Sequence, residues 1–225
     1  MAKRVTICPG DLPLRALLSS TADVTHQTFA SSSSSEDVAE RSAQALKAGH
    51  AHVETSFISG AILAGARDAA NAILCDARAS STQFQPVVAA LDEFRAALIK
   101  ATGRALLEEA ELQLLGYKTG GSYRRHCDDA PGISIGNTGR QVRRSLSLLL
   151  YLTDDDWDVQ KDGGALRVFP PKGSFGGAPV DVAPLAGSLV VFDSASTPHE
   201  VLVTQRPRIV LAGWLQEERA SSQLE

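Results

Sequence analysis

The sequence predicts an α+β fold in which N-terminal helices pack on one sheet of a jelly roll, a double-stranded β-helix of about eight strands. Two observations predict it. Apolar residues recur with helical spacing up to about residue 103, and they alternate with polar residues from residue 111 onward. Clusters of Gly, Pro and Asp then divide the second part into eight short segments, the number that a double-sheet jelly roll needs.

The first part of the chain predicts three helices and one strand. Glu36 to about Gly49 carries apolar residues on one face, and His52–Phe57 can form a strand. Ser59 can cap a helix that continues to about residue 77. A longer helix fits Pro86–Ala101 and ends at Gly103.

The second part predicts the strands of the jelly roll. Their apolar residues follow a period of two, so one set of side chains faces the interior of each sheet. The predicted strands are Glu111–Lys118, Ser122–Cys127, Arg144–Thr153, Ala165–Phe169, Val180–Ala183, Ser188–Asp193, His199–Thr204 and Arg208–Gln216.

Length and composition suggest one domain with an N-terminal extension. Residues 1–35 contain a serine run and few acids, which is typical of a disordered tail or of a targeting segment. We expect the domain to occupy residues 36–217, with helices to about 103 and the jelly roll at 111–216, and residues 218–225 to form a tail.

Charge and cysteine content exclude several classes of partner. The net charge of −4 gives no attraction to nucleic acid, and no apolar run is long enough to span a bilayer. Three widely spaced cysteines do not make a disulfide framework. We therefore expect an intracellular protein, cytoplasmic or nuclear, unless the N-terminal extension directs it to an organelle.

Two segments carry candidate metal ligands. His126 and Asp128 lie two residues apart on a predicted strand, so both should project to one side. His199 begins another strand, and Arg208 follows nine residues later on the next one. Two histidines and one carboxylate form the facial triad of Fe(II) oxygenases, and a nearby buried arginine offers a planar fork for a carboxylate.

The same segments resemble a known family. Four stretches match in order, namely 117–128, 151–158, 163–170 and 198–214. They resemble the 2-oxoglutarate-dependent prolyl 4-hydroxylases, in particular the intracellular oxygen-sensing type. The resemblance implies a peptidyl-proline dioxygenase that uses Fe(II), 2-oxoglutarate and O2, with ascorbate as reductant, and releases succinate and CO2.

The resemblance also implies roles for individual residues. His126, Asp128 and His199 would be the iron ligands, and Arg208 and Tyr151 would bind the distal carboxylate of 2-oxoglutarate. Further candidates lie around these residues. Tyr117 would line the cosubstrate pocket, although its spacing to the first ligand is one residue short, and the candidate substrate contacts are Tyr123, Arg125, Arg143 and Trp214.

The substrate is less well defined by the sequence. We expect a monomer that acts on a proline-containing peptide or protein, with the Gly-rich segment Ala130–Gln141 as a lid over it. One alternative is a hydroxylase of a free amino acid or another small molecule on the same scaffold. Another is a catalytically silent binding module, which the presence of all five cofactor-site residues argues against.

Overall fold

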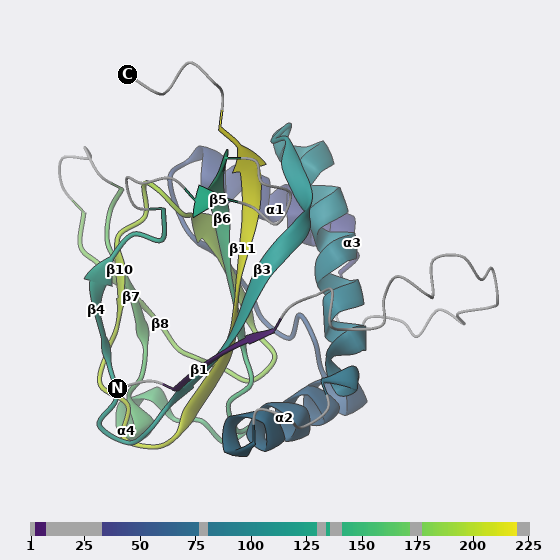
Figure 1. Cartoon of the computed structure of the whole chain (residues 1–225). Helices are drawn as coiled ribbons and strands as arrows, with labels where there is room; N and C mark the ends of the chain where they lie inside the picture. The colour runs from purple at the N-terminus through teal and green to yellow at the C-terminus, as the bar shows by residue number, and fades with distance from the viewer. Residues whose placement is uncertain are drawn as a thin grey trace.

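The computed structural model describes residues 3–7, 33–76, 81–129, 134–135, 141–171 and 177–219. Two antiparallel sheets face each other, and the three long helices, α1 (Ser35–Lys47), α2 (Gly60–Cys75) and α3 (Gln85–Thr102), lie on the outer side of the larger one (Figure 1). The larger sheet has the strand order β1-β3-β11-β6-β9-β2 with β5 beside β6, and the smaller has the order β4-β10-β7-β8. This arrangement confirms the predicted α+β jelly roll.

The helices follow the predicted order with small shifts at their ends. Helix α1 begins after a capping box in which Ser34 and Asp37 bond each other's backbone N–H groups, and α3 ends at Gly103 with φ +68. Ser59 precedes α2, but its side chain makes no capping hydrogen bond. The helical elements are α1 (Ser35–Lys47), α2 (Gly60–Cys75), the 3₁₀ helix η3 (Thr82–Phe84), α3 (Gln85–Thr102) and α4 (Val159–Asp162).

The strands divide between the two sheets. The larger sheet contains β1 (Lys3–Ile7), β2 (His52–Glu54), β3 (Leu106–Tyr117), β5 (Ser134–Ile135), β6 (Gln141–Tyr151), β9 (Leu189–Asp193) and β11 (Arg208–Glu218). The smaller sheet contains β4 (Tyr123–His126), β7 (Leu166–Val168), β8 (Val180–Val182) and β10 (His199–Val201).

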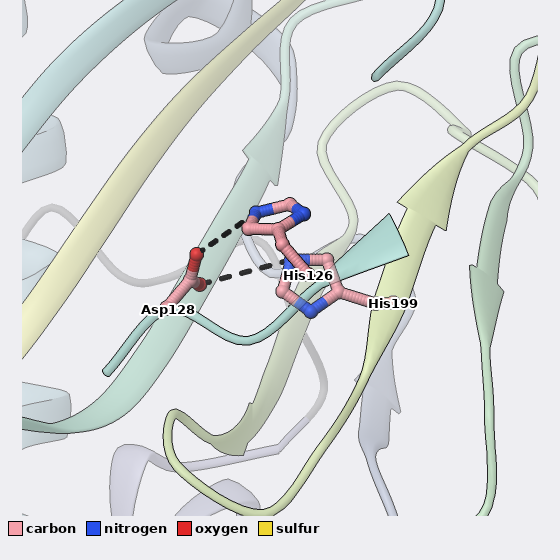
Figure 2. A group of neighbouring side chains, drawn as sticks. All are labelled: His126, Asp128 and His199. Carbon is pink, nitrogen blue, oxygen red and sulfur yellow. Dashed lines mark ion pairs between the residues drawn. The ribbon is translucent and has the colours of Figure 1, made fainter. Parts of the chain in front are cut away.

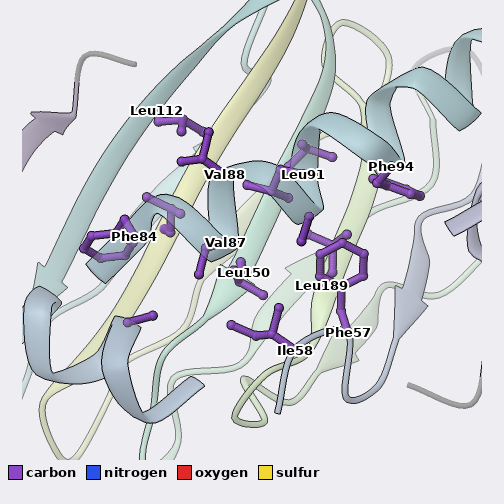
Figure 3. Close-up of a cluster of buried hydrophobic side chains, with 14 of the residues drawn as sticks. Phe57, Ile58, Phe84, Val87, Val88, Leu91, Phe94, Leu112, Leu150 and Leu189 are labelled. Atoms are coloured by element: carbon purple, nitrogen blue, oxygen red, sulfur yellow. The ribbon is translucent and has the colours of Figure 1, made fainter. Parts of the chain in front are cut away.

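The larger sheet is apolar on both faces. Its side chains alternate between the two faces, and both sets are mainly apolar. On β6, Leu148 and Leu150 face the helices, whereas Leu149 and Tyr151 face the smaller sheet. The cluster on the helix side includes Val87, Leu91 and Phe94 of α3 (Figure 3). The helices therefore seal one face of the sheet and leave the other free to form the wall of an internal cavity.

Two segments differ from the sequence-based expectation. Lys3–Ile7 was expected in the extension, yet it pairs as an edge strand with β3 along residues 112–116. Backbone pairing with an open sheet edge can recruit a segment that lacks a strong apolar pattern. Within the predicted lid, Ser134–Ile135 pairs with β6, and the remainder of 130–140 lies outside the described residues, as do residues 8–32.

No helix in the described ranges combines the length and apolar character that crossing a membrane requires.

Candidate metal centre

Three side chains converge at the inner face of the smaller sheet. His126 ends β4 and His199 begins β10, and the two residues are direct partners in the antiparallel register. Asp128 follows β4 and points at both rings (Figure 2). One ligand atom from each residue lies within 4.8 Å of the others, so the three can hold a metal ion together.

Asp128 reaches this place by a different route from the one predicted. The prediction applied strand alternation to residue 128, one position beyond the predicted strand Ser122–Cys127, but β4 ends at His126. The backbone N–H groups of Asp128 and Asp129 instead both donate to the Ser194 carbonyl, at 2.9 and 3.0 Å. The carboxylate is thus aimed by a bend anchored beside β9, and strand alternation does not place it.

A β-bulge sets the direction of the His126 ring. Val201 pairs with Tyr123 while His199 pairs with His126, so three steps on β4 oppose two on β10. Tyr123 and His126 consequently share one face, with their ring centroids 4.6 Å apart.

Hydrogen bonds to the backbone fix the orientation of both imidazoles. Nδ1 of His126 lies 2.9 Å from the Arg124 carbonyl, and Nδ1 of His199 lies 3.1 Å from the Thr197 carbonyl. Because a carbonyl only accepts, each Nδ1 carries a proton, and each Nε2 turns toward the carboxylate. Asp128 Oδ1 lies 3.2 Å from Nε2 of His126, and Oδ2 lies 3.8 Å from Nε2 of His199.

The protonation states suit metal binding. Burial alone would raise the pKa of the Asp128 carboxyl, but its contacts with His126 and Ser147 outweigh this and lower the pKa to about 2. Burial also lowers the pKa of the His199 imidazole below its usual 6.5, although Asp128 opposes the shift. At neutral pH these two residues present an anionic oxygen and a neutral ring, the forms in which they coordinate metals.

The triad opens into a cavity of about 180 Å³ between the two sheets. Its lining comes from the inner faces of β3, β4, β6, β10 and β11 and from Leu166 of β7. Tyr117, which the sequence placed there with doubtful spacing, is in the lining together with Tyr123, Trp214 and Arg208.

Arg208 is the most unusual member of this lining because its charge is fully buried. None of its three side-chain nitrogens has a hydrogen-bond partner within the described part of the chain, and the same holds for the Tyr151 hydroxyl. The guanidinium carbon lies 5.0 Å from the centroid of the Tyr151 ring and 5.2 Å from that of Tyr117. Such donors are costly to bury alone, so this end of the cavity fits an anionic group.

Two features prepare this anion-binding end. Burial raises the pKa of the Tyr151 hydroxyl above 10, so the phenol stays protonated and can donate. Gly164 lies under the Arg208 stem with φ +69, and a Cβ there would sit 3.1 Å from Arg208 Cδ. The sequence does not predict this contact, because it joins residues 44 positions apart.

The four candidate substrate contacts divide into two groups. Tyr123 and Trp214 line the cavity. Arg125 is exposed and lies 3.8 Å from the centroid of the Phe169 ring, and Arg143 pairs with Glu217 at 2.7 Å; neither lines the cavity.

Arg144 lines the cavity where the sequence pointed to its neighbour Arg143. Its guanidinium carbon lies 3.8 Å from the Trp214 ring centroid. It also binds Glu111 through two hydrogen bonds of 3.0 and 2.6 Å. The pair is bidentate, which fixes the direction of the guanidinium at the cavity wall.

Comparison with known proteins identifies the domain. Residues 112–216 match the 2OG-Fe(II) oxygenase superfamily. The chain is 33% identical over 106 residues to prolyl hydroxylase EGLN3 of Mus musculus, covering 46% of this chain and 39% of that protein. It is 34% identical over 70 residues to a hypoxia-inducible factor prolyl hydroxylase of Caenorhabditis elegans, covering 31% of this chain and 9% of that protein. The chain therefore spans well under two thirds of the curated relatives that it matches.

A solved structure extends the likeness to the helices. The crystal structure of a Pseudomonas putida prolyl-4-hydroxylase is 25% identical with a TM-score of 0.67, and the match covers 81% of this chain and 100% of that one. Shared sequence, shared fold and three converging ligand side chains lead to one conclusion. This chain carries a domain of the 2OG-Fe(II) oxygenase superfamily that is homologous to the prolyl hydroxylases.

Proposed function

We propose that this chain is an Fe(II)- and 2-oxoglutarate-dependent dioxygenase that hydroxylates proline in a peptide or protein. One observation carries the proposal. A set of two imidazoles and a carboxylate shares a single cavity with Arg208, whose buried guanidinium has no partner among the described residues. A metal-binding set and an anion-binding group in one cavity match the two needs of an enzyme that binds iron and a dicarboxylate.

The three ligand residues, Arg208 and the neighbouring Tyr151 each have a task in this reaction. His126, Asp128 and His199 would hold Fe(II), and Arg208 and Tyr151 would donate hydrogen bonds to the distal carboxylate of 2-oxoglutarate. When bound, iron with 2-oxoglutarate and O2 supplies the oxidising chemistry, in which one oxygen atom enters a substrate C–H bond and the other enters succinate as CO2 leaves.

The cavity wall would help to orient the cosubstrate. Tyr117 packs beside Arg208, and Leu149 and Val210 cover the apolar part of the lining. Because Arg208 is fully buried, its charge interacts more strongly with a carboxylate than it would in water. These side chains would therefore hold the cosubstrate in one orientation relative to the triad.

The choice of proline rests on the relatives, whose names describe prolyl hydroxylases. The candidate substrate contacts are Tyr123 and Trp214, which line the cavity, together with Arg125 and Arg143, which lie outside its lining. Under this proposal the protein works as an intracellular monomer, in the cytoplasm or nucleus, with ascorbate as its reductant.

The test is turnover of a panel of proline-containing peptides with Fe(II), ascorbate and 2-oxoglutarate. Mass spectrometry should find one added oxygen on a peptide, coupled to equimolar succinate, and none when alanine replaces the proline. Free proline in the same assay separates the small-molecule alternative. Turnover of free proline and of no peptide would refute the peptide substrate and favour the small-molecule alternative. Failure of every substrate to release succinate would refute the proposed activity.

A matched pair of variants ties turnover to the triad. Asp128→Asn should abolish succinate production because it removes the anionic ligand. Asp129→Asn changes the neighbouring acid, which contacts Arg219 at 3.8 Å, and should retain most of the activity. Equal activity in both variants would contradict the ligand assignment.

A further inference from the structure

Two buried serine hydroxyls stand behind Asp128. Ser147 Oγ lies 2.7 Å from Asp128 Oδ2, and it lies 2.8 Å from Ser194 Oγ. Ser147 comes from the middle of β6, Ser194 follows the end of β9, and both are fully buried. Three residues from distant parts of the chain therefore form one hydrogen-bonded chain that ends at a candidate metal ligand.

The chemistry of the groups fixes the direction of this chain. An ionised carboxylate can only accept, so the single proton of the Ser147 hydroxyl goes to Asp128. Ser147 then has only lone pairs left for Ser194, which must donate to it. The hydrogen bonds consequently run from Ser194 to Ser147 to Asp128, in one direction only.

Ser194 also holds the backbone of the same ligand. Its carbonyl accepts from the N–H groups of Asp128 and Asp129, and its own N–H donates to the Ser145 carbonyl at 3.1 Å. One residue thus fixes the ligand at its main chain directly and at its carboxylate through Ser147. Both hydroxyls are buried, so bulk water cannot readily replace a lost hydrogen bond.

The arrangement makes the two carboxylate oxygens unequal. Oδ2 accepts the Ser147 hydrogen bond and lies 3.8 Å from Nε2 of His199, whereas Oδ1 lies closer to its histidine, at 3.2 Å from Nε2 of His126. We propose that Ser194 and Ser147 form a positioning relay that engages Oδ2 and leaves Oδ1 as the one oxygen for the metal. Asp128 would then bind through a single oxygen, which keeps a coordination position open for the reactants.

This inference rests on the proposed iron site, and its test uses metal binding without turnover. Co(II) is titrated into the metal-free protein without 2-oxoglutarate, and its visible absorption reports both affinity and coordination number. Ser147→Ala should weaken binding roughly 10- to 100-fold, the effect usual for a partner of a metal ligand. It should also change the Co(II) spectrum, because the freed Oδ2 can join the metal.

Ser194→Ala tests the direction of the relay. The variant keeps the carbonyl that holds the Asp128 backbone and removes only the hydroxyl. It should weaken Co(II) binding less than Ser147→Ala does. Because Ser194 acts through Ser147, its substitution should add nothing in the double variant, whereas independent effects on the two residues would multiply.

Two further variants separate positioning from general stability. Ser147→Thr keeps the hydroxyl and should therefore give the same Co(II) spectrum as the wild-type protein. Ser145→Ala is the matched control, since Ser145 is buried on the same strand but binds Arg104 at 2.8 Å. It should lower the melting temperature and leave the spectrum unchanged.

The outcomes distinguish the two levels of the argument. Wild-type protein that binds no Co(II) would remove the metal site and the proposed function with it. Wild-type binding combined with an unchanged affinity and spectrum in Ser147→Ala would overturn the relay alone. Full multiplication of the two serine effects would overturn it as well. If Ser147→Ala fails to fold, Ser194→Ala and Ser147→Thr decide, and the relay is wrong if Ser194→Ala binds Co(II) as wild type does.

Discussion

Replacement of Arg208 by methionine should have opposite effects on stability and on ligand binding. The side chain is fully buried, and its three nitrogens have no hydrogen-bond partner in the described residues. An apolar side chain of similar length removes this uncompensated charge and should stabilise the ligand-free protein by about 1–4 kcal/mol. For a chain of this size, the melting temperature should rise by at least about 2 °C.

The same substitution should nearly eliminate 2-oxoglutarate binding. When a guanidinium binds a carboxylate through two hydrogen bonds, each bond contributes about 1.5–3 kcal/mol to the binding free energy. Their loss corresponds to a dissociation constant that is roughly 10² to 10⁴ times larger. Thermal melting with and without 2-oxoglutarate, together with calorimetric titration of the Mn(II)-loaded protein, measures both effects.

Arg206→Met provides the control. Arg206 lies two residues earlier and is paired with Asp154, Asp156 and Asp162 at the surface. Its loss should leave 2-oxoglutarate binding intact and give no rise in melting temperature. If Arg208→Met bound 2-oxoglutarate as tightly as wild type, or melted at a lower temperature, the reasoning from the buried charge would be refuted.

Three further predictions address the support of the site and the fold. Gly164→Ala places a methyl group against the Arg208 stem at a left-handed φ, so 2-oxoglutarate affinity should fall at least tenfold in calorimetry, and an unchanged affinity would contradict the close approach. Burial lowers the pKa of His52 in the folded protein below 6.5, although the contact with Glu54 opposes the shift. As the pH falls below 6.5, His52 therefore becomes protonated in the unfolded chain before it does so in the folded protein, and the folded protein loses stability. His52→Gln should therefore flatten the fall in urea midpoint between pH 7 and 5, and an equally steep fall would count against it. Phe94→Ala removes a fully buried ring and should cost about 3–5 kcal/mol in urea unfolding, whereas a loss below 1 kcal/mol would show that the site collapses.

The sequence brings the two candidate histidines, Tyr151 and Arg208 to attention because each lies in a segment whose strand pattern the structure keeps. Alternation on β6 and β11 places Tyr151 and Arg208 on the inner face, and the two histidines begin or end strands that pair directly. This alternation of apolar residues is a property of the local sequence, and the strands form where it occurs. The predicted sheet architecture follows from the same period of two.

The structure departs from the sequence-based predictions where the pairing register between two strands shifts. Between β11 and β6, Leu215 pairs with Leu146, but the next residue, Gln216, pairs with Arg144. Strand β6 therefore has one extra, unpaired residue, Ser145. A single extra residue reverses which side chains face inward, and this explains why Arg144 lines the cavity when the simple alternation favours Arg143. The bulge in β4 and the Ser194 anchor of Asp128 likewise depend on partners that are distant in the chain.

The candidate centre draws its two imidazoles from one sheet and the side-chain support of its carboxylate from the other. Both imidazoles come from β4 and β10 of the smaller sheet, whereas Ser147 and Arg208 belong to the larger. An ion bound by the triad, with a dicarboxylate reaching Arg208, would fasten the two halves of the sandwich together. Cofactor loading should then protect amides of β4 and β10 from hydrogen exchange, although these short strands lie far from the helix-covered core.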